Sequence, residues 1–274
     1  MLQAAGITIK LRTWCIHQVR LFFIALQFFT RLPIPGWVGF DAGWLPHASR
    51  YFALVGIVVG AVASAIYAGA SWLFPQLVAV LLSTISGIYL TGALHEDGFA
   101  DTCDGLAGAT TSERALEIMK DSRIGVYGAI GVGLLLALKC AALFYLPTQA
   151  VVSSLLIAHP LSRLASSTLI WRLDYVRAES KAKPLAQSMS TMELSIVAVT
   201  SCVPIIGIGL AGWLPWHSIV AGAAAAALAA LWLSKIFVQR IGGYTGDCLG
   251  AVQQVSEVAF YLGVLACMQN GFPH

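Results

Sequence analysis

Four carboxylates fall within nine positions of this sequence, in the stretch from His95 to Gly105. They are Glu96, Asp97, Asp101 and Asp104. If the stretch is helical, the three aspartates stand at i, i+4 and i+7, within roughly 60° of one another at about 100° per residue. Carboxylates on one stripe repel each other, and oxygen ligands of this kind suit Mg²⁺ or Mn²⁺. Mg²⁺ held in this way usually binds substrate phosphate as well, so the stretch predicts phosphate chemistry.

A solvated acidic loop is the alternative interpretation of these acids. Solvated acids usually occur mixed with bases, whereas no Lys or Arg lies between Arg50 and Arg114. We therefore expect the four carboxylates to bind metal, with His95 and Asp97 also available for proton transfer.

A second polar group, from Lys120 to Gly125, precedes a long apolar segment. Lys120 and Arg123 could hold phosphate oxygens, the guanidinium of Arg123 through two parallel hydrogen bonds. Asp121 adds a carboxylate that could act in catalysis or bind the metal. The alternative is a pair of basic side chains that reach from the membrane interface into water.

A third group, from Gly242 to Asp247, leads into the last apolar segment. Its glycine-rich backbone and the helix that follows could offer N–H groups to an anion. The Gly-Lys-Ser/Thr of a Walker motif is absent. About two turns into the last segment lies Glu257, and acids inside a membrane are costly and usually functional. The alternative for Glu257 is a local polar contact within the helix bundle.

Two bases, Lys139 and Arg163, also lie inside apolar segments. A buried Arg needs a partner, so Arg163 is expected to pair with Glu257 or one of the loop acids, or to face a phosphate. No partner can be assigned to Lys139 from the sequence.

The composition defines the elements that must position these groups. The chain is 58% hydrophobic and only 11% charged, against about 25% charged residues in a soluble domain. Lipid permits only helices and closed barrels to cross it, and the apolar runs are too long and too little alternating for a barrel. We therefore predict an all-α, polytopic integral membrane helix bundle. The net charge of +3 gives no indication of a nucleic-acid partner.

We expect residues 1–274 to form one domain with about seven spans. The segment 1–50 contains an apolar stretch, 19–30, that is too short to cross a bilayer, which takes about 20 residues, so an interfacial or re-entrant helix is expected there. No cleavage site of a signal peptide follows it. The predicted spans are 51–73, 76–94, 125–146, 150–171, 194–214, 217–236 and 251–269, and polar loops are expected at 95–124, 172–192 and 237–249.

The basic residues predict the orientation of the bundle. Of the sixteen Lys and Arg, all but Lys139 and Arg163 fall on one side of these spans or at its edge. By the positive-inside rule that side is cytoplasmic, and the N-terminus and all three polar loops face it. Together the acids, the bases and the glycine-rich loop outline one site for metal-assisted phosphoryl transfer.

Two longer motifs resemble those of the cobalamin synthase family, the adenosylcobinamide-GDP ribazoletransferases. The first is the stretch 95–105 with its continuation 117–125, and the second is 242–250 followed by Glu257. The opening Phe28-Phe-Thr-Arg-Leu-Pro-Ile-Pro35 also looks like the N-terminal signature of that family. The resemblance covers the whole chain.

The resemblance implies a reaction and a set of partners. Adenosylcobinamide-GDP and α-ribazole, or α-ribazole 5′-phosphate, would be joined with release of GMP to give adenosylcobalamin or its 5′-phosphate. It implies Mg²⁺, with Mn²⁺ as the other option, in a bacterial-type inner membrane. The lipid bilayer surrounds the chain, and a second copy of the chain or other enzymes of the cobalamin pathway are further partners that it allows.

The same resemblance implies roles for the matching residues. Asp97, Asp101 and Asp104 would hold the metal, and Lys120 and Arg123 would contact phosphate. A second wall of the substrate site, with Glu257 supporting it, would be formed by Gly243, Thr245, Gly246 and Asp247.

Two other classes stay open. A membrane transferase of the CDP-alcohol or prenyl type also uses Asp-rich motifs, but the base that such a motif places soon after Asp-Gly is missing after Asp104-Gly105. A transporter or assembly subunit would put its ionisable groups near the middle of the membrane. Here most acids lie in the predicted loops, and only Lys139, Arg163 and Glu257 favour transport.

Overall fold

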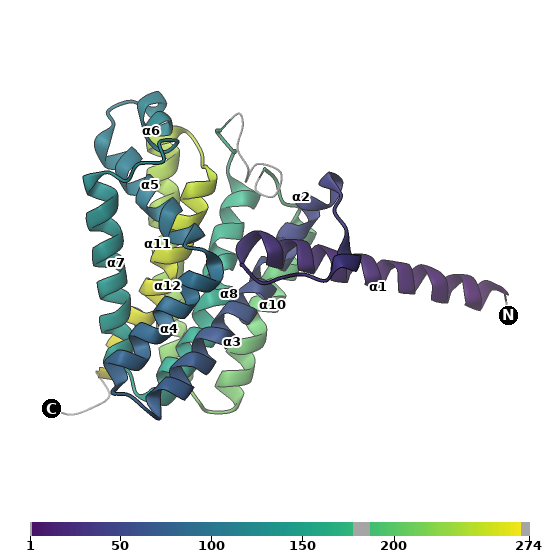
Figure 1. Ribbon diagram of the computed structural model, residues 1–274, viewed down its shortest axis with the longest axis horizontal. Coiled ribbons are helices and arrows are strands. Elements are labelled where there is room, and N and C mark those ends of the chain that lie inside the picture. The colour runs from purple at the N-terminus through teal and green to yellow at the C-terminus, as the bar shows by residue number, and fades with distance from the viewer. Residues whose placement is uncertain (1, 178–186, 270–274) are drawn as a thin grey trace.

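The computed structural model describes residues 2–177 and 187–269, which form a bundle of helices (Figure 1). The predicted all-α class is confirmed, since an isolated bridge between Tyr175 and Tyr244 is the nearest approach to a strand within these ranges. Residues 178–186 of the predicted polar loop 172–192 lie outside the described residues. The α-helices are α1 (Leu2–Phe29), α2 (Leu45–Ala48), α3 (Phe52–Ser71), α4 (Gln76–Thr91), α5 (Leu94–Gly108), α6 (Ser112–Ile118), α7 (Val126–Phe144), α8 (Thr148–Arg172), α10 (Thr191–Leu210), α11 (Trp216–Ile241) and α12 (Gly246–Gln269).

Three long helices begin directly after a proline. Helices α4, α8 and α11 follow Pro75, Pro147 and Pro215. Proline suits the start of a helix because its φ is already near the helical value and the first N–H groups need no partner within the helix. Each proline therefore separates two helices that pass in opposite directions.

The membrane class is confirmed, but the number of spans differs from the prediction. Each of the seven expected segments is a helix, yet length and apolar composition qualify five helices of the described residues, or six if α4 and α5 count as one. Helix α8 does not qualify because it carries serines, His159 and Arg163. These side chains are buried within the bundle, where protein and not lipid surrounds them.

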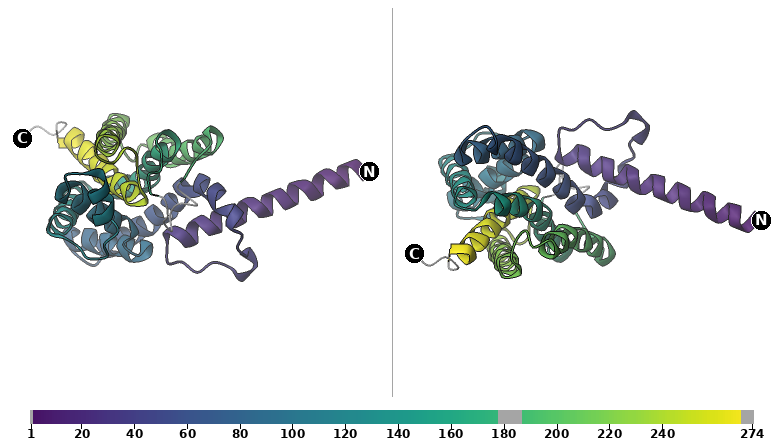
Figure 2. Two further views of the ribbon diagram at one scale, coloured as in Figure 1. Left: turned by 90° about the horizontal axis from the view of Figure 1, so that it is seen from above. Right: turned by 90° about the horizontal axis from the view of Figure 1, so that it is seen from below.

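Helix α1 is much longer than the predicted apolar stretch 19–30. It runs from Leu2 to Phe29 because the first proline of the chain comes only at Pro33. Its N-terminal part extends away from the bundle, and its C-terminal end lies against α3 (Figures 1 and 2). The helix lies across the direction of the bundle helices, which is the orientation that an interfacial helix requires.

The first part of the predicted polar loop 95–124 is also a helix. Helix α5 turns by 88° from α4 at a break formed by Gly92 and Ala93, both in the left-handed conformation. An 88° turn sets α5 nearly perpendicular to α4, so the two helices form a broken span or a re-entrant pair. Helix α12 packs against α5, α7, α8 and α11, which places α12 at the centre of the bundle.

Candidate active site

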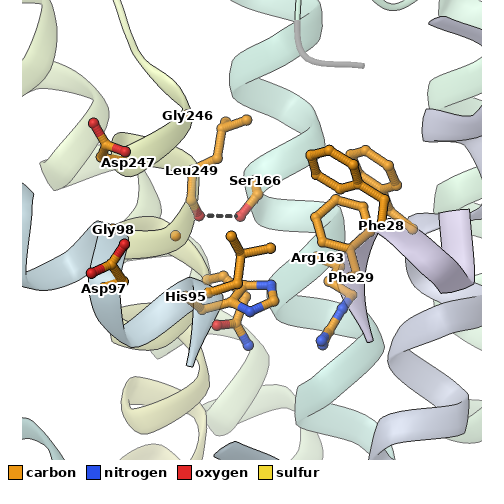
Figure 3. A pocket seen from close by; sticks show the side chains of 14 residues that line it. Phe28, Phe29, His95, Asp97, Gly98, Arg163, Ser166, Gly246, Asp247 and Leu249 are labelled. Atoms are coloured by element: carbon orange, nitrogen blue, oxygen red, sulfur yellow. Dashed lines mark hydrogen bonds between the residues drawn. The ribbon is translucent and has the colours of Figure 1, made fainter. Parts of the chain in front are cut away.

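Helices α5 and α12 cross with their backbones almost in contact. A Cβ added at Gly98 of α5 would lie 3.0 Å from both Cα and the carbonyl oxygen of Asp247. A Cβ at Gly250 of α12 would lie 3.0 Å from the carbonyl oxygen of His95. The two glycines therefore permit the crossing, and it places the carboxylates of Asp97 and Asp247 on the same side of the site (Figure 3).

Three acids share this crossing. Asp97 and Asp101 come from one face of α5, as predicted for a helical stretch, and Asp247 comes from the first turn of α12. Burial and the negative charges of Asp247 and Asp97 raise the pKa of Asp101 to about 7. The aspartates are thus close enough to repel each other, as a site for a cation would require.

Arg177 offsets part of that negative charge. Its Nη2 lies 2.8 Å from Oδ2 of Asp247, and its side chain is largely buried. The segment that carries Arg177 is held by backbone hydrogen bonds that join Tyr244 to Asp174 and Val176. Nothing in the sequence marks Arg177, because it belongs to no motif and lies 70 positions from its partner.

Asp104 contacts a different partner from the other aspartates of α5. Its two carboxylate oxygens accept hydrogen bonds from the backbone N–H groups of Gly125, at 2.7 Å, and Gly128, at 2.8 Å. These N–H groups open α7 and have no acceptor within that helix. Asp104 therefore caps α7 and joins the acidic helix to the predicted basic group that precedes it.

The basic group itself is exposed. Arg123 binds Asp121 through two bonds, Nη2 to Oδ2 at 2.6 Å and Nε to Oδ1 at 3.0 Å. Hydrogen bonds from Arg123 lower the pKa of Asp121 to about 2. Lys120 is exposed beside this pair. The three residues thus lie at the surface near the acidic helix and do not line the cavity described below.

The glycine-rich stretch forms the turn between α11 and α12. Gly242 ends α11 with a φ of +77°, which only glycine adopts readily. Gly243 has no room for a side chain, because a Cβ would collide with the carbonyl oxygen of Asp174. Thr245 immediately precedes α12, and its hydroxyl accepts a hydrogen bond from the Cys248 N–H at 3.4 Å. One of the free N–H groups in the first turn of α12 therefore already has a hydrogen-bond acceptor within the chain.

Glu257 lies in a buried polar network within the bundle. Lys139 Nζ is 2.5 Å from its Oε1, which assigns a partner to the lysine that the sequence left unassigned. His159 Nδ1 lies 3.2 Å from Oε2, and Gln253 and Tyr261 donate to the same carboxylate. No motif or spacing in the chain points to His159, Gln253 and Tyr261, which come together only through packing.

Arg163 and Glu96 border the same network. No described carboxylate lies within ion-pair distance of Arg163, whose Nη1 donates instead to the carbonyl of His159 at 2.9 Å. Its Nε is buried without a hydrogen-bond partner. Glu96 is buried too and accepts from Gln254 at 2.8 Å. Glu96 therefore faces the interior of the bundle, away from the aspartates.

A cavity adjoins the crossing of α5 and α12. Asp97 and Asp247 lie at one end of it and Phe28 and Phe29 at the other (Figure 3). His95, Arg163 and Ser166 also line the cavity, and Ser166 is fixed by a 2.8 Å bond to the carbonyl of Leu249.

The acids suit a hard cation but form no closed cage. Within the described ranges, no three Asp, Glu, His or Cys side chains converge on one point as a complete ligand set. Mg²⁺ commonly takes only one or two protein carboxylates and completes its shell with water and phosphate. Asp97, Asp101 and Asp247, with oxygen donors and repelling charges, fit that pattern.

Fold and site together define a multi-pass helical membrane protein with an acid-lined cavity. The chain belongs to the cobalamin-5-phosphate synthase family, whose model matches residues 21–265. The match begins in α1 and ends in α12, so it includes all the residues of the candidate site.

Curated relatives agree over nearly the whole chain. Proteins named adenosylcobinamide-GDP ribazoletransferase from Shewanella frigidimarina and Leptothrix cholodnii are each 45% identical to it, covering 92% of this chain and 96% and 97% of their own. The protein of the same name from Vibrio cholerae is 38% identical, covering 93% of this chain and 96% of its own. No solved structure matches the chain.

Proposed function

We propose that this protein joins adenosylcobinamide-GDP to α-ribazole, or to α-ribazole 5′-phosphate, and releases GMP. The product is adenosylcobalamin or its 5′-phosphate, so the reaction is the assembly of the nucleotide loop late in cobalamin biosynthesis. Membership of the family supports the reaction. The structural observation that carries it is the pair of carboxylates, Asp97 and Asp247, at one end of a cavity that Arg163 and His95 also line.

Asp97, Asp101 and Asp247 are the residues that would hold Mg²⁺, or Mn²⁺ in its place. Bound there, the metal would neutralise charge on the diphosphate of the donor and on the phosphate of the leaving GMP. Glu96 and Asp104 were predicted as ligands as well. Their carboxylates are engaged by Gln254 and by the start of α7, so the proposal does not use them.

The bond changes follow from the chemistry of the two substrates. The 3′-hydroxyl oxygen of the ribose attacks the phosphorus nearest cobinamide, and the bond from that phosphorus to the bridging oxygen of GMP breaks. The hydroxyl proton passes to His95 or to a carboxylate of the site. Burial and the positive charge of Arg163 lower the pKa of His95, so its ring is neutral but a weaker base than an ordinary histidine, and this favours a carboxylate as the proton acceptor.

The remaining predicted residues surround this centre. The turn of Gly243, Thr245 and Gly246 positions Asp247, and Glu257 balances the charge of Lys139 beneath the site. Arg163 would contact substrate from the floor of the cavity. Lys120, Asp121 and Arg123 are exposed near the start of α7 and outside the cavity lining, where we expect them to contact the long donor substrate.

The site is proposed to face the cytoplasm from the inner membrane. The distribution of Lys and Arg supports this orientation, because the turns at Pro75, Pro147 and Pro215 carry none of them. Association with a second copy of the chain, or with other enzymes of the pathway, stays a prediction.

The test is an assay of the protein purified in detergent with adenosylcobinamide-GDP, α-ribazole and Mg²⁺. We expect GMP and the corrinoid product in equal amounts, none after treatment with EDTA, and recovery with Mg²⁺. Asp101→Asn should lower turnover by roughly 100-fold or more, since even outer-shell partners of a metal are worth 10–100-fold.

Glu113→Gln is the matched control, because Glu113 is an exposed acid of α6 at the same end of the bundle. It should retain turnover. A folded wild-type protein that releases no GMP with either acceptor would exclude the reaction. Full turnover by Asp101→Asn would keep the reaction but remove the proposed metal site.

A further inference from the structure

The aromatic end of the cavity belongs to no part of the proposed chemistry. Phe28 and Phe29 from the end of α1 and Phe52 from the start of α3 line it. The ring of Phe29 lies edge to face with Phe28 and Phe52, at centroid distances of 4.9 and 4.5 Å, and stacks on His95 at 5.9 Å. The sequence Phe28–Pro35 was noted as a motif, but no function had been attached to it.

The end of α1 is fixed against the break between α4 and α5. The Arg31 N–H donates to the carbonyl of Leu90 at 2.8 Å, and the guanidinium of Arg31 lies over the ring of Tyr89. Gly92 leaves room for that guanidinium, since a Cβ there would approach Arg31 Nε to 2.9 Å. These contacts fix the position of the phenylalanines relative to α5, the helix that carries the acids.

The aromatic and acidic ends are therefore two parts of one rigid cavity. Figure 3 shows Phe28 and Phe29 across the cavity from Asp97 and Asp247, with His95 between them and Arg163 beside Phe29. A ligand that fills it must have an apolar, flat part at one end and a group for the acidic, metal-binding end at the other. Arg163, buried and without a carboxylate partner, adds a place for a negative or polar group next to the phenylalanines.

We propose that the aromatic end binds the base of the acceptor nucleoside, and that Phe28, Phe29 and Phe52 select that base. This inference rests on the proposed function. The base of α-ribazole is a dimethylbenzimidazole, a flat two-ring aromatic with two methyl groups. Stacked or edge-on phenyl rings suit it, and its ribose then extends toward the acids, where the 3′-hydroxyl reacts.

The donor substrate does not fit this end. Its corrin macrocycle with the adenosyl group is larger than the cavity. Its guanine carries hydrogen-bonding groups on its edge, and a wall of three phenylalanines would leave them unpaired. The donor is thus left to approach from the rim of the site, and the two substrates reach the acids from different directions.

The experiment measures KM separately for each substrate in wild-type protein and in Phe28→Ala. Phe28 is only partly buried, so its removal disturbs the core less than removal of the buried Phe52. We expect the KM for α-ribazole to rise about 10-fold, the effect of losing a hydrophobic contact to a substrate. The KM for adenosylcobinamide-GDP should stay unchanged. Phe28→Tyr keeps the ring and should restore the wild-type value.

A second acceptor sharpens the test. The riboside of unsubstituted benzimidazole lacks both methyl groups and should be about 10-fold poorer than α-ribazole with wild-type protein. With Phe28→Ala this preference should shrink, because the methyl groups have lost their contact. Phe74→Ala is the matched control, since Phe74 lies in the turn between α3 and α4, on another part of the bundle. It should change neither KM.

Leu94→Trp provides a variant that removes nothing from the core. Leu94 lines the cavity and is 40% exposed, so a larger side chain there would narrow the space for the base and raise the same KM. A rise in the KM for adenosylcobinamide-GDP alone would overturn the proposal and place the donor in the cavity. Unchanged KM values in both variants would also overturn the proposal and would indicate that lipid occupies the cavity.

Binding without turnover separates this inference from the proposed function. Equilibrium dialysis of α-ribazole against wild-type protein should show binding that weakens about 10-fold in Phe28→Ala. If wild-type protein binds α-ribazole in this way but forms no product, the proposed reaction is wrong and the proposed binding site for the base is supported. If product forms and Phe28→Ala binds α-ribazole as tightly as wild type, the base site is wrong and the reaction stands.

Discussion

Gly98→Ala should separate the two helices that bring the acids together. The added Cβ would lie 3.0 Å from Cα and from the carbonyl oxygen of Asp247, whereas carbon contacts are favourable at about 3.5–4.0 Å. Both atoms belong to the backbone of α12, so no rotation of a side chain relieves the contact. The helices must move apart by roughly 0.5 Å at this point.

That displacement sets the magnitude of two effects. Overpacking of a well-packed contact costs about 1–3 kcal/mol, and the better helix propensity of Ala returns about 0.5–1 kcal/mol. The net loss of stability is then about 0–2.5 kcal/mol, with the middle of the range at about 1 kcal/mol. A misplacement of about 1 Å at an active site costs on the order of 100-fold in rate, so half of it should cost roughly 10-fold.

The measurement compares Gly98→Ala with Gly133→Ala in one detergent. Gly133 lies within α7, and a Cβ there would meet nothing within 4 Å. This control therefore gains the helix propensity without the clash, and its melting temperature should rise while GMP release is unchanged. Gly98→Ala should melt lower and release GMP roughly 10-fold more slowly.

The result that would refute the reasoning is specific. If Gly98→Ala melts like Gly133→Ala and retains full turnover, the backbones of α5 and α12 are not in contact. The pairing of Asp97 with Asp247 would then lose its structural basis. A lower melting temperature with full turnover would keep the contact but show that the reaction does not depend on the spacing of these acids.

Two further changes test the polar contacts around the site. Lys139→Met should destabilise the protein by roughly 3–5 kcal/mol, because it leaves Glu257 charged and buried without its base; in a thermal melt, Glu257→Gln in the same chain should restore much of the loss. Asp104→Ala should cost about 1–2 kcal/mol, because the N–H groups of Gly125 and Gly128 lose their acceptor. The same variant should keep the Mg²⁺ concentration for half-maximal turnover, and a large increase in it would instead make Asp104 a metal ligand.

The sequence was sufficient for the class of fold because lipid restricts the choice so strongly. Uncharged runs of 44 and 41 residues each had to hold two helices, and proline marks where each divides. The sequence was less informative about α8. Its serines and buried Arg163 lower its hydropathy, although the helix packs among the membrane helices. The sequence was also misleading about α1. Only the apolar stretch 19–30 was expected to be helical, because basic residues precede it, yet the helix is continuous from Leu2 to Phe29.

For the site, the sequence located residues with a local signal and missed those joined only by packing. The spacing of Asp97 and Asp101 is helical, and the glycine-rich turn next to Asp247 is visible in the chain. No periodicity indicates that Arg177 reaches Asp247, since that contact depends on the bridge between Tyr175 and Tyr244.

The sequence also does not show that the aspartates of α5 have two different functions. Asp97 and Asp104 look equivalent in the sequence, yet the first faces the cavity and the second accepts the N–H groups that begin α7. The difference arises because α7 starts beside the last turns of α5, where a carboxylate satisfies N–H groups that would otherwise lack a partner. One aspartate of the stripe therefore fixes the helix that carries the others, and this leaves Asp97 and Asp101 free to face Asp247 across the crossing of α5 and α12.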